Sequence, residues 1–217
     1  MQIFFVRHGE TDWKSLEARG IRGWARSFAP LTPIGRVQID TIASDYRLQE
    51  ADAILCSSYA RALESAARLS RVLNKPLYVE YDLHEWLPHV DPLADDAEAI
   101  AKAQQEFMYY AGFTPELGQE PRGAARPTPT PNRPSGERTP PPPSERTWES
   151  LDEVRDRVIG ALRRYANLSS VVVVSHAVVI ASIVGAQRMI EHAEIVPFEL
   201  DLDNPEKSFA TERQRYS

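Results

Sequence analysis

The chain has 217 residues, of which 42% are hydrophobic, which is enough apolar material for the core of one domain. Its net charge of −6 argues against nucleic acid or an anionic membrane surface as the main partner. A site for an anion must therefore be a local cluster of positive groups. The single cysteine, Cys56, excludes an intramolecular disulfide and fits a reducing compartment, so we expect a cytoplasmic protein.

Predicted strands and helices alternate along the chain. Apolar, β-branched and aromatic runs predict strands at 2–6, 53–56, 77–80 and 171–175, with a weaker candidate near 196–200. Two of these runs are continuously apolar, which is typical of parallel strands covered on both faces. This alternation of strands and helices predicts an α/β fold with a mainly parallel central sheet covered by helices on both faces.

The predicted helices lie between these runs. Thr32 as N-cap and Pro33 at the first helical position start one helix, with an apolar stripe of Ile34, Val37, Ile42 and Tyr46. Ser58 is expected to cap a second, packed through Leu63, Ala66, Ala67 and Ser70. Segments 95–111 and 149–166 have the pattern of further amphipathic helices. The apolar stretch 171–190 is long enough to span a bilayer, but its internal Ser175 and His176 favour a strand, a turn and a buried helix.

Residues 114–147 interrupt this pattern within a single predicted domain, 1–217. Ten of the 17 prolines fall in this segment, which has no aromatic residue, so it cannot bury enough apolar surface to offset chain entropy. We expect a flexible, proline-rich insertion. Its prolines at 131–134 and 140–143 have PxxP spacing, so it is either a docking segment for a protein partner or a solvated linker.

Charged and imidazole side chains follow several of the predicted strands. Arg7 and His8 follow the first, Arg61 lies just beyond 53–56, and His176 ends the run at 171–175. Ligands bind at the carboxyl ends of strands in open α/β sheets, and arginine suits a phosphate or carboxylate. Each residue alone would more often be a surface ion-pairing group or a hydrogen-bonded core histidine. Their joint occurrence at strand ends indicates a shared anion site.

These segments also resemble the signature of a known family, the histidine phosphatase superfamily, also called phosphoglycerate mutase-like. The resemblance covers about residues 1–110 and 147–190, in the family's order. It is carried by Arg7-His8-Gly9-Glu10-Thr11, Pro30-Leu31-Thr32 with Gly35, Ser57-x-x-x-Arg61-Ala62, Glu149-Ser150-Leu151 with Arg157, and Val173-Val174-Ser175-His176.

The resemblance implies a metal-independent phosphatase that hydrolyses a small phosphomonoester without a cofactor. The family's chemistry makes His8 the nucleophile that forms a phosphohistidine, with Arg7, Arg61 and His176 as donors to the phosphoryl oxygens. The family's position for its general acid falls on Glu85, although Glu80, Asp82 and Asp91 are nearby carboxylates. The implied phosphate-binding set is Arg7, Gly9, Thr11, Arg61, His176 and Ala177, and we add Arg22 from the loop 19–29 as a further candidate. Gly9 is expected to let the backbone approach the phosphate.

The chain departs from the family pattern at several positions. Lys14 replaces an asparagine, Ala177 replaces a glycine after the second histidine, and Glu64 replaces an uncharged polar residue. The arginine-rich loop 19–29 does not align with the family's segment. Its Arg19, Arg22 and Arg26 either reach a second anionic group or are solvated charges.

Two other patterns suggest different chemistry. Cys56 and Arg61 superficially resemble a cysteine-phosphatase loop, but only four residues separate them and none is glycine, so a buried, inert thiol is expected. His84 and His89 could suggest a metal site, but their spacing does not place both on one helical face. The alternatives to a phosphatase are a phosphomutase of the same family and a non-catalytic phospho-ligand binding or scaffolding protein. The sequence does not specify the oligomeric state.

Overall fold

The computed structural model describes residues 1–88, 97–111, 139–185 and 190–209. Its strands are β1 (Gln2–Arg7), β2 (Ala53–Ser57), β3 (Leu77–Glu80), β4 (Ser170–Ser175) and β5 (Ile195–Glu199). Its α-helices are α1 (Trp13–Ala18), α2 (Pro33–Ile42), α3 (Tyr46–Gln49), α4 (Ala60–Leu73), α5 (Ala97–Ala111), α6 (Leu151–Arg163) and α7 (Ala177–Val184). Three 3-10 turns are η1 (Gly23–Phe28), η2 (Tyr81–Leu83) and η3 (Pro143–Glu145).

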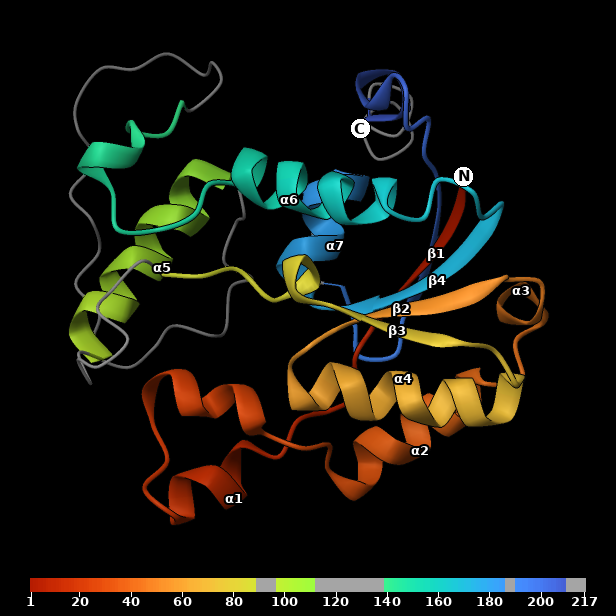
Figure 1. Cartoon of the computed structure of the whole chain (residues 1–217). Helices are drawn as coiled ribbons and strands as arrows, with labels where there is room; N and C mark the ends of the chain where they lie inside the picture. The colour runs from red at the N-terminus through yellow and green to blue at the C-terminus, as the bar shows by residue number, and fades with distance from the viewer. Residues whose placement is uncertain (89–96, 112–138, 186–189, 210–217) are drawn as a thin grey trace.

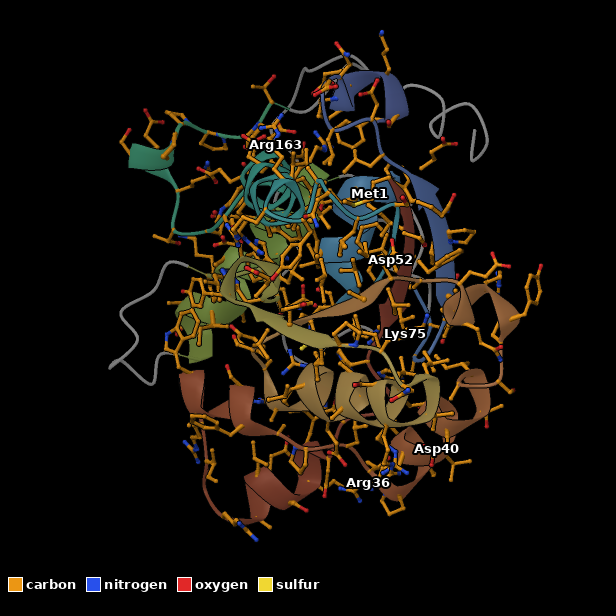
Figure 2. All side chains as sticks on the ribbon, turned by 45° about the vertical axis from the view of Figure 1, so that its right-hand side comes forward. Met1, Arg36, Asp40, Asp52, Lys75 and Arg163 are labelled. Atoms are coloured by element: carbon orange, nitrogen blue, oxygen red, sulfur yellow. The ribbon has the colours of Figure 1, made fainter. Side chains whose placement is uncertain are left out.

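The strands form one sheet in the order β3-β2-β4-β1-β5. Strands β3, β2, β4 and β1 run parallel, and β5 pairs with β1 antiparallel. The predicted α/β class and mainly parallel sheet are therefore confirmed. The carboxyl ends of β1, β2 and β4 meet at one edge. The starts of β1 and β2 lie at the opposite edge, where Figure 2 shows Met1 and Asp52.

Each face of the sheet is covered by its own hydrophobic cluster, because successive side chains of a strand point to opposite faces. One cluster joins residues such as Phe5, Leu55 and Val173 to α6 and α7. The other joins residues such as Val6 and Cys56 to α2 and α4. Figure 1 shows these two helix pairs on opposite sides of the sheet. The expected helix layers on both faces are thus present.

Helix starts are partly as predicted. The Thr32 hydroxyl accepts a hydrogen bond from the amide of Gly35, and Pro33 begins α2. The Ser150 and Glu153 side chains form a capping box at the start of α6. The predicted Ser58 cap is wrong: the N-cap of α4 is Tyr59, with no side-chain cap bond.

The predicted apolar faces of α2 and α4 are also wrong in part. In α2, Ile34 and Val37 are exposed, whereas the buried residues are Gly35 and Ile39. Ile42 packs against the core as predicted, but Tyr46 is exposed and begins the next helix, α3. The inward face is set by the close approach of Gly35 to Glu10. In α4, Ala66 is buried as predicted, but Leu63 and Ala67 are exposed, and the buried face also carries Ala62 and Leu69.

Helix α5 is attached to the domain by aromatic packing. Phe107 lies 4.7 Å from Trp86 and 5.9 Å from Trp148 between ring centroids. The ring nitrogen of Trp148 also donates a hydrogen bond to Glu106 at 3.0 Å. The end of the predicted insertion, 139–147, lies beside this cluster, with Arg146 over the Trp148 ring. Residues 112–138 lie outside the described ranges.

The stretch 171–190 forms β4 and then α7, the predicted strand, turn and helix, up to the end of α7 at Val184. Residues 186–189 lie outside the described ranges. Of the helices that the structure describes, none is both long and apolar enough to cross a membrane.

A close backbone contact fixes the turn after β1 against the start of α2. A Cβ atom added at Gly9 would lie 2.4 Å from the carbonyl oxygen of Gly35, and one added at Gly35 would lie 2.2 Å from that of Glu10. Both distances are far below van der Waals contact, and the obstructing atoms are backbone. Glycine is therefore required at both positions to hold His8, Gly9 and Glu10 in place.

We predict that Gly35→Ala destabilises the protein by about 1–3 kcal/mol, the usual cost of overpacking. The matched control is Gly160→Ala, also in a helix, where an added Cβ meets no atom within 4 Å. That variant should gain about 0.5–1 kcal/mol from helix propensity. Urea unfolding of both variants measures the difference, and equal changes in the two would contradict the steric explanation.

Candidate active site

His8 lies at the end of β1, buried and held on both ring nitrogens. Its Nδ1 lies 2.8 Å from the carbonyl oxygen of Gly9, which can only accept, so the ring proton lies on Nδ1. Nε2 accepts a hydrogen bond from Nε of Arg61 at 3.2 Å. Burial, together with the positive charge of Arg61, holds the pKa of His8 well below its usual range. The imidazole is therefore neutral, with the lone pair on Nε2.

His176 lies beside His8, at the end of β4. The two rings are 5.2 Å apart between centroids, and His176 is fully buried. Its Nε2 lies 2.8 Å from the hydroxyl of Ser57, whereas its Nδ1 is buried without a hydrogen-bond partner among the described residues. Burial, followed by the charge of Arg61, lowers the pKa of His176 well below its usual range. An unused buried polar atom beside His8 indicates a place for a ligand atom.

Two guanidinium groups reach the same place, one from a helix and one from a strand. Arg61, in the first turn of α4, is 6% exposed and packs over Trp13 and Tyr59, 5.3 and 5.0 Å from their ring centroids. Arg7, the last residue of β1, donates to the carbonyl oxygen of Ile190 at 2.5 Å, and its Nε is buried without a partner in the described part of the chain. Two desolvated cations beside two neutral imidazoles favour an anionic ligand.

Glu85 follows η2 and is the acidic group of this cluster. One carboxylate oxygen accepts a hydrogen bond from the amide of Trp86 at 2.9 Å. Burial raises the pKa of Glu85, although Arg61 and Arg7 act in the opposite direction. A carboxyl group with a raised pKa keeps its proton to higher pH than usual, as a general acid requires.

The other described carboxylates that the sequence offered as the acid are paired with residues outside this cluster. Glu80 accepts a hydrogen bond from Tyr165 at 2.5 Å and pairs with Arg164. Asp82 also lies 3.0 Å from Arg164. Asp91 lies outside the described residues. Of the three candidates that the structure describes, Glu85 is the one whose charge interacts with both Arg7 and Arg61.

A nearly buried ion pair at the start of α6 holds the segment that carries Glu85. Arg157 makes two hydrogen bonds to the Glu149 carboxylate, at 2.6 and 3.0 Å. Arg157 also donates to the carbonyl oxygen of Asp82 at 2.6 Å, and the amide of Leu87 donates to Glu149 at 3.3 Å. The motif Glu149-Ser150-Leu151 with Arg157 therefore positions the backbone on both sides of Glu85.

His192 belongs to this cluster, and the sequence analysis missed it. Its ring lies 5.6 Å from that of His8 between centroids, and burial together with the charge of Arg7 lowers its pKa. His192 precedes β5, and the next residue, Ala193, has φ of 57° and donates to the carbonyl oxygen of Arg7 at 3.0 Å. Because β5 is antiparallel, its start lies at the same sheet edge as the end of β1. To place His192 in the site, the direction of β5 would have to be known, and the sequence pattern does not give it.

The remaining predicted residues lie at different distances from His8. Thr11 is buried, with its hydroxyl 3.4 Å from Nδ1 of His8, the side of the ring away from Arg61. Ala177 is the first residue of α7, directly after His176. The amide of Gly9 donates to Ser65 at 3.2 Å, and the backbone of Gly35 occupies the space where a side chain of residue 9 would lie. Arg22 is exposed, at the rim of a cavity.

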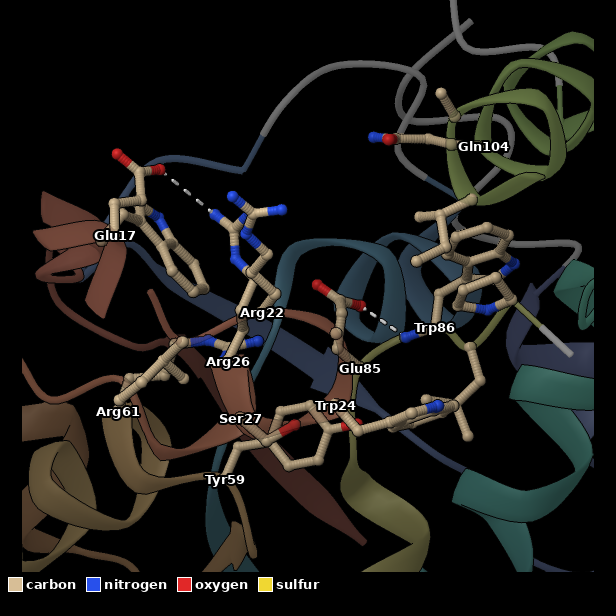
Figure 3. Close-up of a pocket in the computed structure, with 17 residues that line it drawn as sticks. Glu17, Arg22, Trp24, Arg26, Ser27, Tyr59, Arg61, Glu85, Trp86 and Gln104 are labelled. Carbon is tan, nitrogen blue, oxygen red and sulfur yellow. Dashed lines mark hydrogen bonds and ion pairs between the residues drawn. The ribbon is translucent and has the colours of Figure 1, made fainter. Parts of the chain in front are cut away.

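That cavity opens in front of the cluster and has a volume of about 730 Å³. Arg61 and Glu85 form part of its lining, and the rest comes from α1, η1, α5 and the segment after Glu85. Figure 3 shows Arg61 and Glu85 facing the same space as Arg22 and Arg26. Arg22 and Arg26 from the arginine-rich loop therefore border the site, whereas Arg19 is not part of the lining.

Two departures from the family pattern have a structural place. The Glu64 carboxylate accepts hydrogen bonds from the amide of Leu31 at 2.9 Å and from Arg36 at 2.6 Å, so it joins α4 to the start of α2. Lys14 is exposed in α1 and is not part of the cavity lining. Neither residue contacts His8.

The other candidate centres do not assemble. Among the residues that the structure describes, no three histidine, cysteine or acidic side chains are grouped to hold a metal ion, and His89 lies outside them. His84 is buried between Tyr59 and Tyr81, with ring centroids at 6.3 and 4.9 Å. Cys56 is fully buried, and burial raises the pKa of its thiol to about 12.

Comparison with known proteins gives the family. Residues 3–108 and 116–206 match the model of the histidine phosphatase superfamily (branch 1), and the chain belongs to this superfamily. No curated protein matches the chain.

Solved structures share the fold. YhfR from Bacillus stearothermophilus is 20% identical with a TM-score of 0.59, over 92% of this chain and 91% of that one. A mycobacterial glucosyl-3-phosphoglycerate phosphatase is 15% identical with a TM-score of 0.60, over 92% and 90%. A putative alpha-ribazole-5'-P phosphatase from Escherichia coli is 20% identical with a TM-score of 0.55, over 93% and 91%. At these identities the likeness establishes the fold and not the substrate.

We predict that Cys56→Ala leaves phosphatase activity within about two-fold of the wild type. The thiol is buried with a pKa of about 12, so it supplies no thiolate at neutral pH. Mass spectrometry of the folded protein after iodoacetamide treatment should find Cys56 unmodified, with modification after unfolding as the control. If Cys56→Ala lost activity but kept the melting temperature of the wild type, Cys56 would have to take part in the reaction.

Proposed function

We propose that the protein is a phosphatase that hydrolyses a small phosphomonoester through a phosphohistidine on His8. The observation that carries the proposal is the neutral, buried imidazole whose Nε2 lone pair faces Arg61, with an unused Nδ1 of His176 alongside. This arrangement supplies a nucleophile and donors for the anion at one point. The reaction itself needs no cofactor, because guanidinium and imidazole groups neutralise the phosphoryl oxygens.

In the first step, Nε2 of His8 attacks phosphorus in line with the leaving oxygen. The N–P bond forms as the P–O bond to the alcohol breaks, and Glu85 gives its proton to the departing oxygen. Arg7 and Arg61 stabilise the negative charge on the equatorial oxygens. The hydroxyl of Ser57 can donate to Nε2 of His176, and the ring proton on Nδ1 is then a further donor to the phosphoryl group.

In the second step, water attacks the phosphohistidine. Glu85, now ionised, takes a proton from the water as the P–O bond forms and the N–P bond breaks. Inorganic phosphate leaves, and Nε2 of His8 regains its lone pair. The carbonyl of Gly9 holds the proton on Nδ1 throughout, so the ring is returned to the same tautomer.

We predict that His8→Ala abolishes hydrolysis of phosphomonoesters while the fold, followed by thermal unfolding, is kept. Wild-type protein mixed with radiolabelled substrate and quenched in base should carry a label that is stable to alkali and lost in acid, as expected for phosphohistidine. EDTA should not reduce the activity.

Three results would point elsewhere. Full activity of His8→Ala would exclude His8 as the nucleophile. Binding of phosphate analogues without turnover by the wild type would favour the binding or scaffolding alternative. Conversion of a phosphoglycerate to its isomer, with little free phosphate, would identify a phosphomutase.

We predict that Glu85→Gln lowers kcat on an alkyl phosphate by about 10²–10⁴-fold, the usual contribution of a general acid. The loss should be smaller on 4-nitrophenyl phosphate, whose leaving group needs no proton. Because Glu85 acts in its protonated form and its pKa is raised, wild-type kcat should fall as pH rises through that pKa. The depressed pKa of His8 keeps the nucleophile neutral to lower pH than usual, so the optimum should be acid-shifted.

Asp82→Asn is the control for this assignment. Its carboxylate pairs with Arg164 and is not part of the cavity lining, so kcat and the pH profile should not change. An alkaline limb that disappears in Asp82→Asn and persists in Glu85→Gln would transfer the role of general acid to Asp82.

A further inference from the structure

The cavity in front of Arg61 and Glu85 is much larger than a phosphoryl group requires. Its volume of about 730 Å³ lies within the usual range for sites that enclose a whole small molecule. Arg61 and Glu85 belong to the machinery proposed above. The remaining walls must therefore contact the alcohol part of the substrate, and their chemistry indicates what that part contains.

These walls are mainly aromatic and aliphatic. Three of the chain's four tryptophans line the cavity, together with Tyr59. Aliphatic side chains complete the apolar surface: Ile21, Leu87, Pro88, Ile100 and Ala101. A compact, polar alcohol would leave this surface in contact with water, whereas a flat apolar group would cover it.

Two of the tryptophans are already held by neighbours. The ring of Trp13 has Arg26 4.8 Å and Arg61 5.3 Å from its centroid. Trp86 packs on Phe107, and its ring nitrogen donates to the carbonyl oxygen of Glu149 at 2.7 Å. These two form rigid parts of the wall. Trp86 also follows Glu85 directly, so this wall adjoins the proton donor.

Trp24 differs from them. It lies in η1 and lines the cavity, and its indole makes no hydrogen bond, ring contact or cation contact with other described residues. Figure 3 shows it in the same space as Tyr59 and Glu85. A large aromatic face without a partner among the described residues, inside a cavity that adjoins the reacting groups, is suited to stack on a ring of the substrate.

Arg22 and Arg26 are the two further cations of the cavity wall, and both are exposed, so water weakens their attraction for a second anion. Arg26 lies 3.8 Å from Glu17, so one positive charge there is already opposed, and both side chains are largely solvated. Ser27 and Gln104 offer neutral hydrogen bonds. Aromatic contact is therefore the dominant recognition chemistry of the site, with polar groups at its edge.

We propose that this cavity binds an aromatic ring in the alcohol part of the phosphomonoester, with Trp24 as the residue that stacks on it. The inference rests on the proposed phosphatase function and assigns its substrate class: phosphates of alcohols that carry a flat aromatic ring. Ring binding places the leaving oxygen next to Glu85, and the phosphoryl group reaches His8.

The test compares substrates whose leaving groups are all primary alcohols, so that differences report on binding. The three are 2-naphthylmethyl phosphate, ethyl phosphate and glucose 6-phosphate. We expect the wild type to hydrolyse the naphthylmethyl ester with kcat/KM at least ten-fold above the other two. Trp24→Ala should lower this value by about ten-fold, mainly through KM, consistent with the loss of one stacking contact. Trp24→Phe should retain most of it.

The same variants give internal controls. Trp24→Ala should hydrolyse ethyl phosphate at the wild-type rate, because that substrate does not reach the ring. Phe28→Ala removes another aromatic side chain of η1, which is 76% exposed and does not line the cavity, and should behave as the wild type on all three substrates. An equal loss on all substrates in Trp24→Ala would mean a structural role and would overturn the inference.

Other outcomes are distinguishable. Hydrolysis of all three substrates at similar kcat/KM, or a preference for glucose 6-phosphate, would overturn the ring site and leave the phosphatase intact. Hydrolysis of none would overturn the proposed function. In that case, calorimetry measures the affinity of 2-naphthylmethyl phosphate for His8→Ala and for the double variant that also carries Trp24→Ala. This comparison tests the ring site without hydrolysis. Equal affinities of the two proteins would overturn the ring site.

Discussion

The chemistry of this site depends on keeping one buried imidazole neutral and in one tautomer. His8 has Arg61 on one nitrogen and the carbonyl oxygen of Gly9 on the other. Protonation would place a third cation beside Arg7 and Arg61 in a desolvated space, so burial and charge both favour the neutral form. The carbonyl oxygen of Gly9 fixes the proton on Nδ1 only while the turn after β1 is held. The glycine contact between that turn and α2 is what holds it.

The sheet brings these groups together from distant parts of the chain. Strands β1, β2 and β4 are parallel neighbours, so His8, Ser57 and His176 fall at adjacent strand ends. The continuously apolar runs of β2 and β4 predicted parallel strands covered on both faces, because such strands usually have that pattern. The order of the strands in the sheet comes from the structure alone. Arg61 reaches the same sheet edge because it lies in the first turn of α4, the helix after β2.

The parts that escaped prediction depend on contacts that have no local signature. In α2 the apolar residues Ile34 and Val37 have helical spacing, yet the face that packs inward carries Gly35, because only a glycine can approach Glu10. Hydrophobic periodicity cannot detect a position where the absence of a side chain is the requirement. His192 was missed for a related reason. Its place beside His8 depends on the antiparallel direction of β5, and a five-residue apolar run has no direction.

The loop from His84 to Pro88 joins the proposed chemistry to the proposed ring site. Glu85 and Trp86 are consecutive, and both sides of the loop are held by the pair of Glu149 and Arg157. Movement of the Trp86 wall would therefore move the proton donor. Binding energy from substrate contact with Trp86 can then be used to align the leaving oxygen with Glu85, which raises kcat, whereas contact with Trp24 in η1 contributes mainly to affinity. This coupling gives a physical reason for placing an aromatic wall directly beside the acid. A substrate whose ring packs against the wall also has its leaving oxygen held next to Glu85 for protonation.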